Sequence, residues 1–283
     1  MRKSILLLCS IFIQLAAVAQ ISPKEDDIIK ILAIGNSFSE DGIENYLFDL
    51  ASNTGKKMVI GNLYIGGAPL SLHIKNANEN AENYQYRKTG LDGKKVTTKD
   101  VSISQALSDE NWDYISFQQA SPLSGKYDVI MESLPELVSY VRAKVDTETQ
   151  FVYHQTWAYQ HDSDHKGFAN YDRDQLTMYK AIADVSKKVS KLDAFKYIIP
   201  AGTAIQNART SSIGDTFTRD GYHLQLDYGR FTAACTWYQK IFGEDVRKNS
   251  YKPEKVTELQ AKIAKEAAHK AVKKPYKISK VKL

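Results

Sequence analysis

Short apolar runs that alternate with amphipathic stretches are the feature that most constrains how this 283-residue chain can fold. Each run stops at a glycine, a proline or a polar residue, and apolar side chains then recur at helical spacing. Strands separated by helices pair in parallel, because the crossover helix returns the chain to the same end of the sheet. The runs expected to form strands are residues 27–34, 58–63, 113–117, 150–153 and 195–199.

This pattern predicts an α/β protein, a three-layer α/β/α sandwich with a mainly parallel sheet. One segment departs from it, since residues 84–99 alternate around Leu91-Asp92-Gly93 and so indicate an inserted hairpin. The stretches expected to be helical run from Ser39 or Asp41 to Gly55, and over 68–79, 130–145 with a start or break at Pro135, 174–189, 203–209, 228–242 and 256–271.

The first 19 residues contain, in order, the charged, apolar and cleavage-site regions of a secretory signal peptide. Arg2 and Lys3 precede an apolar run over residues 4–15, and Ala17-Val18-Ala19 offers a cleavage site. The run is too short and wrongly flanked for a membrane span, so we expect a periplasmic or secreted protein without one. Removal of this segment leaves Cys235 as the one cysteine, which excludes an intrachain disulfide.

The formal net charge of +5 is distributed unevenly along the chain. Residues 246–283 contain twelve Lys or Arg against three Glu, whereas residues 20–245 carry a net charge of −6. A weakly acidic body is unlike a nucleic-acid groove, so no nucleic-acid partner is expected. The basic tail is more typical of a solvated helix face than of a polyanion site.

Asp220 and His223 are the strongest candidates for catalytic residues. With Gly221 between them, one turn of chain can place the carboxylate against one ring nitrogen, which leaves the other nitrogen as an oriented base. The candidate nucleophile is Ser37, because Gly35-Asn36-Ser37 lies between a buried strand and a helix, where a tight turn exposes the hydroxyl. Taken alone, a serine at this position is more often a helix cap.

Other strand ends would add polar groups at the same edge of a parallel sheet. Gly66 and Gly67 follow the second strand, and the Gly67 amide can donate a hydrogen bond to an oxyanion, although an ordinary turn would look the same. Gln118 and Gln119 follow the third strand, where a side-chain amide can serve as a further donor. Adjacent side chains of an extended segment point to opposite faces, so only one of the two should reach the site. We favour Gln119, with Gln118 second.

Three aromatic residues, Trp157, Tyr159 and Tyr222, lie close to these strand ends and can stack on sugar rings. Aromatic side chains in this number are more often part of a core. A second Asp–His pair, Asp162 and His165, sits in a polar segment without an apolar run to anchor it, and ranks below the first. The same segment lacks a metal-ligand spacing, so neither a metal nor another cofactor is expected.

Together these segments resemble the sequence blocks of the SGNH (GDSL) hydrolase superfamily, and in particular an exported bacterial branch. The resemblance implies a flavodoxin-like fold, with a hydrolase domain over residues 28–245 and a basic C-terminal helix and tail, 246–283, packed on it or extending from it. It implies that Ser37 is the nucleophile, that His223 is the base oriented by Asp220, and that the amides of Ser37 and Gly67 form an oxyanion hole. The segments that carry it are Gly35-Asn36-Ser37-Phe38-Ser39, Gly66-Gly67, Gln118-Gln119, Thr156-Trp157-Ala158-Tyr159, Ile199-Pro200-Ala201-Gly202-Thr203-Ala204 and Asp220-Gly221-Tyr222-His223.

The chain departs from this superfamily at two places. Asn36 replaces the usual Asp of Gly-Asp-Ser, which changes the hydrogen bonding of the loop but removes no member of the triad. The third block lacks its Gly-x-Asn-Asp, so Gln118 or Gln119 must supply the missing amide, or the hole has two donors. Loss of one such donor can cost about 2.7–4 kcal/mol of transition-state stabilisation.

The sequence therefore predicts an exported serine esterase that removes small acyl groups through an acyl-Ser37 intermediate. Because exported members of the superfamily often remove acetyl groups from carbohydrates, the resemblance implies an acetylated carbohydrate as the substrate. A lipase, thioesterase or arylesterase of the same fold is the alternative within the class. A non-catalytic carbohydrate-binding protein is the alternative from another class, and the intact Ser37, Asp220 and His223 argue against it.

Overall fold

The structure, a computed structural model, describes residues 28–283, so the expected signal peptide lies outside the described residues. A seven-stranded sheet with the order β4-β3-β2-β1-β5-β6-β7 forms its centre. The strands are β1 Ile28–Gly35, β2 Lys57–Tyr64, β3 Tyr84–Thr89, β4 Lys95–Val101, β5 Tyr114–Phe117, β6 Gln150–His154 and β7 Phe195–Ile199.

Five of the strands are parallel, and the other two form the inserted hairpin. β1 pairs in parallel with β2 and β5, and β6 lies in parallel between β5 and β7. The hairpin β3–β4 pairs antiparallel with the outer edge of β2. Without the hairpin the strand order is that of a flavodoxin-like sheet, which confirms the fold predicted from the alternation.

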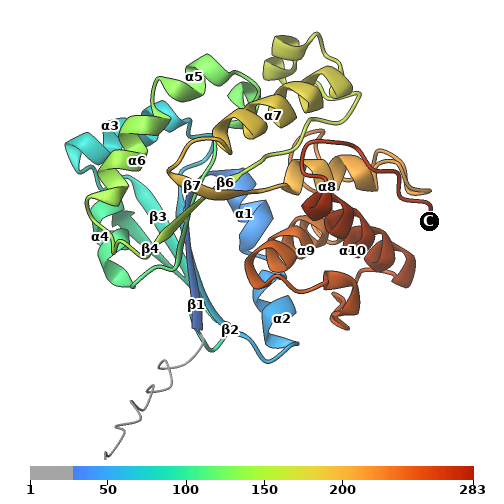
Figure 1. Cartoon of the computed structure of the whole chain (residues 1–283), viewed down its shortest axis with the longest axis horizontal. Helices are drawn as coiled ribbons and strands as arrows, with labels where there is room; N and C mark the ends of the chain where they lie inside the picture. Colours follow the sequence, from blue (N-terminus) through green and yellow to red (C-terminus); the bar gives the residue numbers. More distant parts are fainter. Residues whose placement is uncertain (1–27) are drawn as a thin grey trace, which may run out of the picture.

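Helices cover both faces of this sheet (Figure 1). No helix within residues 28–283 combines the length and the apolar character needed to cross a membrane. The α-helices are α1 Ser37–Ile43, α2 Leu47–Ser52, α3 Leu70–Glu79, α4 Ile103–Asp109, α5 Tyr127–Met131, α6 Leu134–Arg142, α7 Gln175–Val189, α8 Ala201–Ala208, α9 Tyr228–Phe242 and α10 Glu258–Lys273; the 3₁₀ turns are η1 Ser121–Leu123, η2 Lys166–Tyr171 and η3 Val246–Lys248.

The side chains of the central strand alternate between two apolar layers, as the pleat requires. Leu32 and Ile34 pack into the layer beneath α3 and α6, whereas Ile31 and Ala33 face α2 and α9. Figure 1 shows α3 to α6 on one side of the sheet and α1, α2, α9 and α10 on the other. Because both faces are covered, the parallel strands are predominantly apolar.

The structure corrects the expectation of one helix from Ser39 or Asp41 to Gly55. The chain breaks between Ile43 and Leu47, where Tyr46 adopts a left-handed conformation with φ of 65° and donates its hydroxyl to the carbonyl of Leu226. α1 is therefore a short, separate helix. The start or break expected at Pro135 is present, because the stretch over 130–145 is divided between α5 and α6 and Pro135 lies in the first turn of α6.

The basic C-terminal segment contributes to the core. Thr257 and Gln260 form a capping box that starts α10, and the apolar stripe of that helix packs against α8 and α9. Ile263 and Ala267 are completely buried in this stripe, and Val281 is 2% exposed beyond it. The lysines of α10 are therefore presented by a helix that the rest of the fold holds in place.

We predict that Ile263→Ala lowers the free energy of unfolding by about 2–5 kcal/mol, because it removes fully buried methyl groups and leaves a cavity. Leu259→Ala on the same helix is the matched control, since Leu259 is 47% exposed and its loss should cost only about 0.5 kcal/mol. Denaturant titration of both variants measures the difference. Equal, small losses would mean that α10 does not belong to the cooperative fold.

Candidate active site

Ser37 stands at the first position of α1, directly after the central strand β1. Asn36 caps the helix in an extended conformation, and its Oδ1 accepts the amide of Phe38 at 2.9 Å. A side chain at Gly35 would lie 2.4 Å from the Ser39 hydroxyl, so the turn needs a glycine there. The first amides of a helix have no intrahelical acceptor, which leaves the Ser37 amide available for a ligand.

Asp220 and His223 lie in a tight loop that aims the imidazole at Ser37. Asp220 Oδ1 accepts the backbone amides of Tyr222 at 3.2 Å and of His223 at 2.7 Å, and Oδ2 lies 2.7 Å from His223 Nδ1. The turn requires Gly221, which has φ of 86° and whose missing side chain would meet Ser163. On the other edge of the ring, His223 Nε2 lies 2.8 Å from Ser37 Oγ.

The three side chains therefore form one continuous hydrogen-bonded line from carboxylate to hydroxyl. Burial opposes ionisation of Asp220, but hydrogen bonds from the His223 ring and from the amides of His223 and Tyr222 outweigh it and lower the pKa of this carboxyl. An ionised Asp220 accepts a hydrogen bond from Nδ1–H of His223, which in the neutral ring leaves Nε2 as the acceptor that faces Ser37.

Asp41, on α1, anchors the loop that carries Asp220 and His223. Its carboxylate is completely buried and accepts the backbone amide of Leu224, the residue after His223, at 2.8 Å. Arg219 Nη1 lies 3.2 Å from each of its oxygens, and Arg230 Nε lies 2.7 Å from Oδ1. The helix that presents Ser37 and the loop that presents His223 are thereby held against each other.

A cavity of about 320 Å³ opens in front of Ser37, and we refer to it as the Ser37 cavity. Gly66 and Gly67 line it opposite the serine, and Gly67 has φ of 68°, which points to a glycine-specific turn. No hydrogen-bond acceptor for the Gly67 amide is found within residues 28–283. The remaining residues that line it are Asn36, Phe38, Tyr64, Ala120, Ser121, Pro122, His165, Tyr222 and His223.

The structure does not bring Gln118 and Gln119 into this cavity, which corrects the expectation that one of them completes an oxyanion hole. Gln118 Nε2 donates to Asn36 Oδ1 at 2.8 Å, so its amide is already used behind the nucleophile loop. Gln119 Oε1 accepts the amides of Leu70 and Ala120, which turns that side chain toward the start of α3. Both glutamines are 1% exposed.

Trp157 and Tyr159 are also placed differently from the expectation that they stack on a substrate. Both side chains have no exposed surface. Trp157 stacks on Phe38 with ring centroids 4.4 Å apart and donates Nε1 to the carbonyl of Tyr222, and the Tyr159 hydroxyl lies 2.8 Å from Ser121 Oγ. They support the walls of the Ser37 cavity, whereas Tyr222 lines it as expected.

Sequence reasoning ranked His165 below His223 and missed Tyr64. Asp162 accepts a hydrogen bond from Gln160, and the structure shows no contact between its carboxylate and His165, so the second Asp–His pair is not formed. His165 instead lines the Ser37 cavity, packed against Tyr222 with ring centroids 4.7 Å apart. Tyr64 is the last residue of β2, and its position at the carboxyl end of a parallel strand could have identified it as a site residue.

No group of three or more His, Cys, Asp or Glu side chains within the described part of the chain is arranged to hold a metal ion. Two completely buried histidines, His73 and His154, do not line the Ser37 cavity. Burial lowers the pKa of His73 to about 4 and that of His154 to about 3, so both rings are neutral near pH 7.

A parallel α/β/α sandwich that carries a serine, a histidine and an aspartate in line beyond its strand ends has the arrangement used by serine hydrolases. The chain belongs to the family described as "Domain of unknown function (DUF4886)", whose model matches residues 30–271. A DUF4886 family protein from Bacteroides uniformis is 52% identical, with a TM-score of 0.89 over 90% of this chain and 98% of that one.

More distant solved structures include a putative SGNH hydrolase from Slackia heliotrinireducens, which is 20% identical with a TM-score of 0.49 over 76% of this chain and 99% of that one. Another is a catalytic mutant of an acetylxylan esterase from Geobacillus stearothermophilus, 12% identical with a TM-score of 0.41 over 76% of this chain and 93% of that one. Among curated proteins, none matches the chain.

We predict that Asp41→Ala destabilises the protein by about 3–5 kcal/mol, because it leaves two guanidinium groups without their buried partner. It should also speed hydrogen exchange in peptides that cover residues 219–224, since the Leu224 amide loses its acceptor. Asp184→Ala is the control, because Asp184 is an exposed partner of Lys188. Unchanged exchange in the 219–224 loop would show that Asp41 does not anchor it.

Proposed function

We propose that this protein is a serine ester hydrolase in which Ser37 is the nucleophile, His223 the general base and Asp220 the group that orients His223. The observation that carries the proposal is the 2.8 Å contact between His223 Nε2 and Ser37 Oγ, together with the 2.7 Å contact between Asp220 and the other ring nitrogen. A serine hydroxyl is a weak nucleophile until an oriented base accepts its proton.

The reaction that this geometry supports is acyl transfer. Ser37 Oγ attacks the ester carbonyl while its proton passes to His223 Nε2, and His223 then protonates the departing alcohol. The acyl group remains on Ser37 until water, deprotonated by His223, attacks it and releases the acid. Both steps pass through an oxyanion, for which the amides of Ser37 and Gly67 are the proposed donors.

Asn36 gives this two-donor hole its support. Its Nδ2 donates to the carbonyl of Ala68 at 2.9 Å, while its Oδ1 accepts from Phe38 and Gln118. One side chain thereby ties the loop that holds Gly67 to the turn that holds Ser37. An aspartate could not make the bond to Ala68, so the replacement of Asp by Asn fits a loop whose hydrogen bonds differ from those of Gly-Asp-Ser proteins.

The substrate that fits is a short acyl ester of a polar alcohol, and we propose acetylated carbohydrate. A cavity of about 320 Å³ is at the lower end of the range for small-molecule sites, which suits a short acyl chain better than a lipid. The hydroxyl-bearing side chains of Tyr64, Ser121 and Tyr222 line it beside His165. Action on such substrates outside the cytoplasm would require the export that the first 19 residues predict.

His165 is the proposed contact for the alcohol part of the substrate. Its Nδ1 accepts the amide of Gly167 at 3.0 Å, so the neutral ring carries its proton on Nε2 and can donate a hydrogen bond. Burial, followed by the nearby His223, lowers the pKa of His165, so the ring is neutral at neutral pH. It lies beside the face of the cavity formed by Tyr222 and His223, where the leaving alcohol must be protonated.

We predict that Ser37→Ala abolishes hydrolysis of acetyl esters and labelling by a fluorophosphonate probe, with a loss of at least about 10³-fold in kcat, because the acyl acceptor is gone. Ser121→Ala is the matched control, since Ser121 lines the same cavity but does not contact His223. It should still be labelled. Full activity in a correctly folded Ser37→Ala variant would contradict the proposal.

We predict that His165→Phe raises KM for an acetylated sugar about fivefold and leaves kcat nearly unchanged, because the proposed hydrogen bond to the sugar, worth about 1 kcal/mol, is lost while the ring packing remains. The Gly167 amide also loses its acceptor, which affects both esters equally. The KM for a small aryl acetate, which offers no sugar hydroxyl, should not change. Steady-state kinetics with both esters tests this. An equal rise in KM for both esters would assign His165 to the structure of the cavity rather than to sugar binding.

A further inference from the structure

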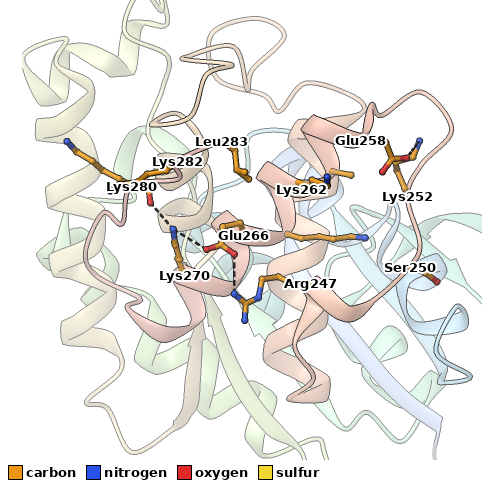
Figure 2. Close-up of a pocket in the computed structure, with 12 residues that line it drawn as sticks. Arg247, Ser250, Lys252, Glu258, Lys262, Glu266, Lys270, Lys280, Lys282 and Leu283 are labelled. Carbon is orange, nitrogen blue, oxygen red and sulfur yellow. Dashed lines mark hydrogen bonds and ion pairs between the residues drawn. The ribbon is translucent and has the colours of Figure 1, made fainter.

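A second hollow, of about 580 Å³, lies on the outer side of α10 and shares no lining residue with the Ser37 cavity. Seven of its twelve lining residues are Lys or Arg, and two are Glu. They come from three separate segments of chain: η3 and the residues just after it, α10, and the extended residues 280–283 (Figure 2). We refer to this hollow as the basic pocket.

Several cations of the basic pocket are held in fixed positions by the protein itself. Glu266 lies between Arg247, at 3.2 Å, and Lys270, at 3.1 Å, as the dashed lines of Figure 2 show. Lys270 also donates to the carbonyl of Lys280, and Lys265 donates to the carbonyl of Asn249 at 2.6 Å. These bonds order long side chains before any ligand arrives, which reduces the entropy that binding would otherwise cost.

The carboxylates in the basic pocket do not neutralise its positive charge. Seven cations meet three carboxylates: Glu266 is shared by Arg247 and Lys270, Asp245 also pairs with Arg247 at 2.6 Å, and Glu258 faces Lys252 at 3.8 Å. No acceptor within residues 28–283 lies against the ammonium groups of Lys262 and Lys282. Burial lowers the pKa of Lys265, and an anion bound beside it would oppose that shift. The pocket is therefore a concave surface with some cations held in place by hydrogen bonds and others whose charge no carboxylate balances.

We propose that the basic pocket binds an acidic oligosaccharide, recognised through its carboxylate or sulfate groups. Its volume falls within the range of sites for small organic ligands and exceeds what an inorganic anion needs. No aromatic side chain lines it, so binding would depend on its charged and hydrogen-bonding groups rather than on stacking of a base or a sugar ring. The net charge of −6 on residues 20–245 also disfavours a long polyanion that would extend beyond the pocket.

This binding site is independent of the chemistry at Ser37, although it would allow an esterase acting on carbohydrates to hold an acidic glycan. Isothermal titration calorimetry with a sulfated tetrasaccharide, a neutral tetrasaccharide and a single-stranded tetranucleotide tests it directly, without reference to activity. We expect the sulfated tetrasaccharide to bind, and the neutral sugar and the tetranucleotide to bind at least tenfold more weakly.

The variant that tests the location is Lys262→Gln combined with Lys282→Gln, which should weaken binding of the sulfated tetrasaccharide at least tenfold. Lys94→Gln with Lys99→Gln is the matched control, because it removes the same charge from exposed residues that do not line the pocket. The control should bind within twofold of the unmodified protein. Both double variants should hydrolyse a small acetyl ester at the unmodified rate, so the result does not depend on the proposed activity.

Three results would overturn this proposal. The first is the absence of measurable binding of the sulfated tetrasaccharide. The second is an equal loss of binding in both double variants, which would indicate attraction by overall charge. The third is binding of the tetranucleotide, or of vesicles that contain anionic lipid, as tight as that of the sulfated sugar, which would assign the pocket to another class of partner.

Discussion

The geometry of the site depends on the hydrogen bonds and ion pairs made by the buried carboxylate of Asp41. Ser37 and His223 are far apart in the sequence, and the contact between them can form only if α1 and the 219–224 loop are held in one relative position. Asp41 meets this requirement because it lies one helical turn beyond Ser37 and accepts the amide of Leu224, next to His223. Arg219 and Arg230 compensate the charge that burial would otherwise make unfavourable.

Behind Ser37, a chain of buried polar side chains connects β6, β5 and the turn that precedes α1. His154 Nδ1 lies 2.8 Å from Gln118 Oε1, Gln118 donates to Asn36, and Asn36 donates to the carbonyl of Ala68. The side chains of His154, Gln118 and Asn36 are buried, and these bonds supply their partners, except for His154 Nε2, which has none within residues 28–283. The asparagine and the glutamine at the strand end are thus explained together, as members of one network that orders the loops around Ser37.

The C-terminal helix shows how one element can serve two purposes. Its apolar stripe, which includes Ile263 and Ala267, completes the core against α8 and α9. Other positions of the same helix carry lysines of the basic pocket, among them Lys262 and Lys270. The packing of the apolar stripe therefore holds these charges in place, and the basic pocket and the Ser37 cavity have no lining residue in common.

The sequence by itself determined the parallel sheet and its inserted hairpin, and it singled out Ser37, Asp220 and His223 as candidates, because these depend on local patterns; that Ser37 meets His223 was decided by the tertiary structure. Apolar periodicity identifies strands, and an Asp three residues before a His makes its own turn around Gly221. Only the tertiary structure decided that Gln118 supports Asn36, that Trp157 is covered by Phe38, and that His165 lines the Ser37 cavity. The direction of a side chain at a strand end is set by partners from distant segments, and no local pattern records those partners.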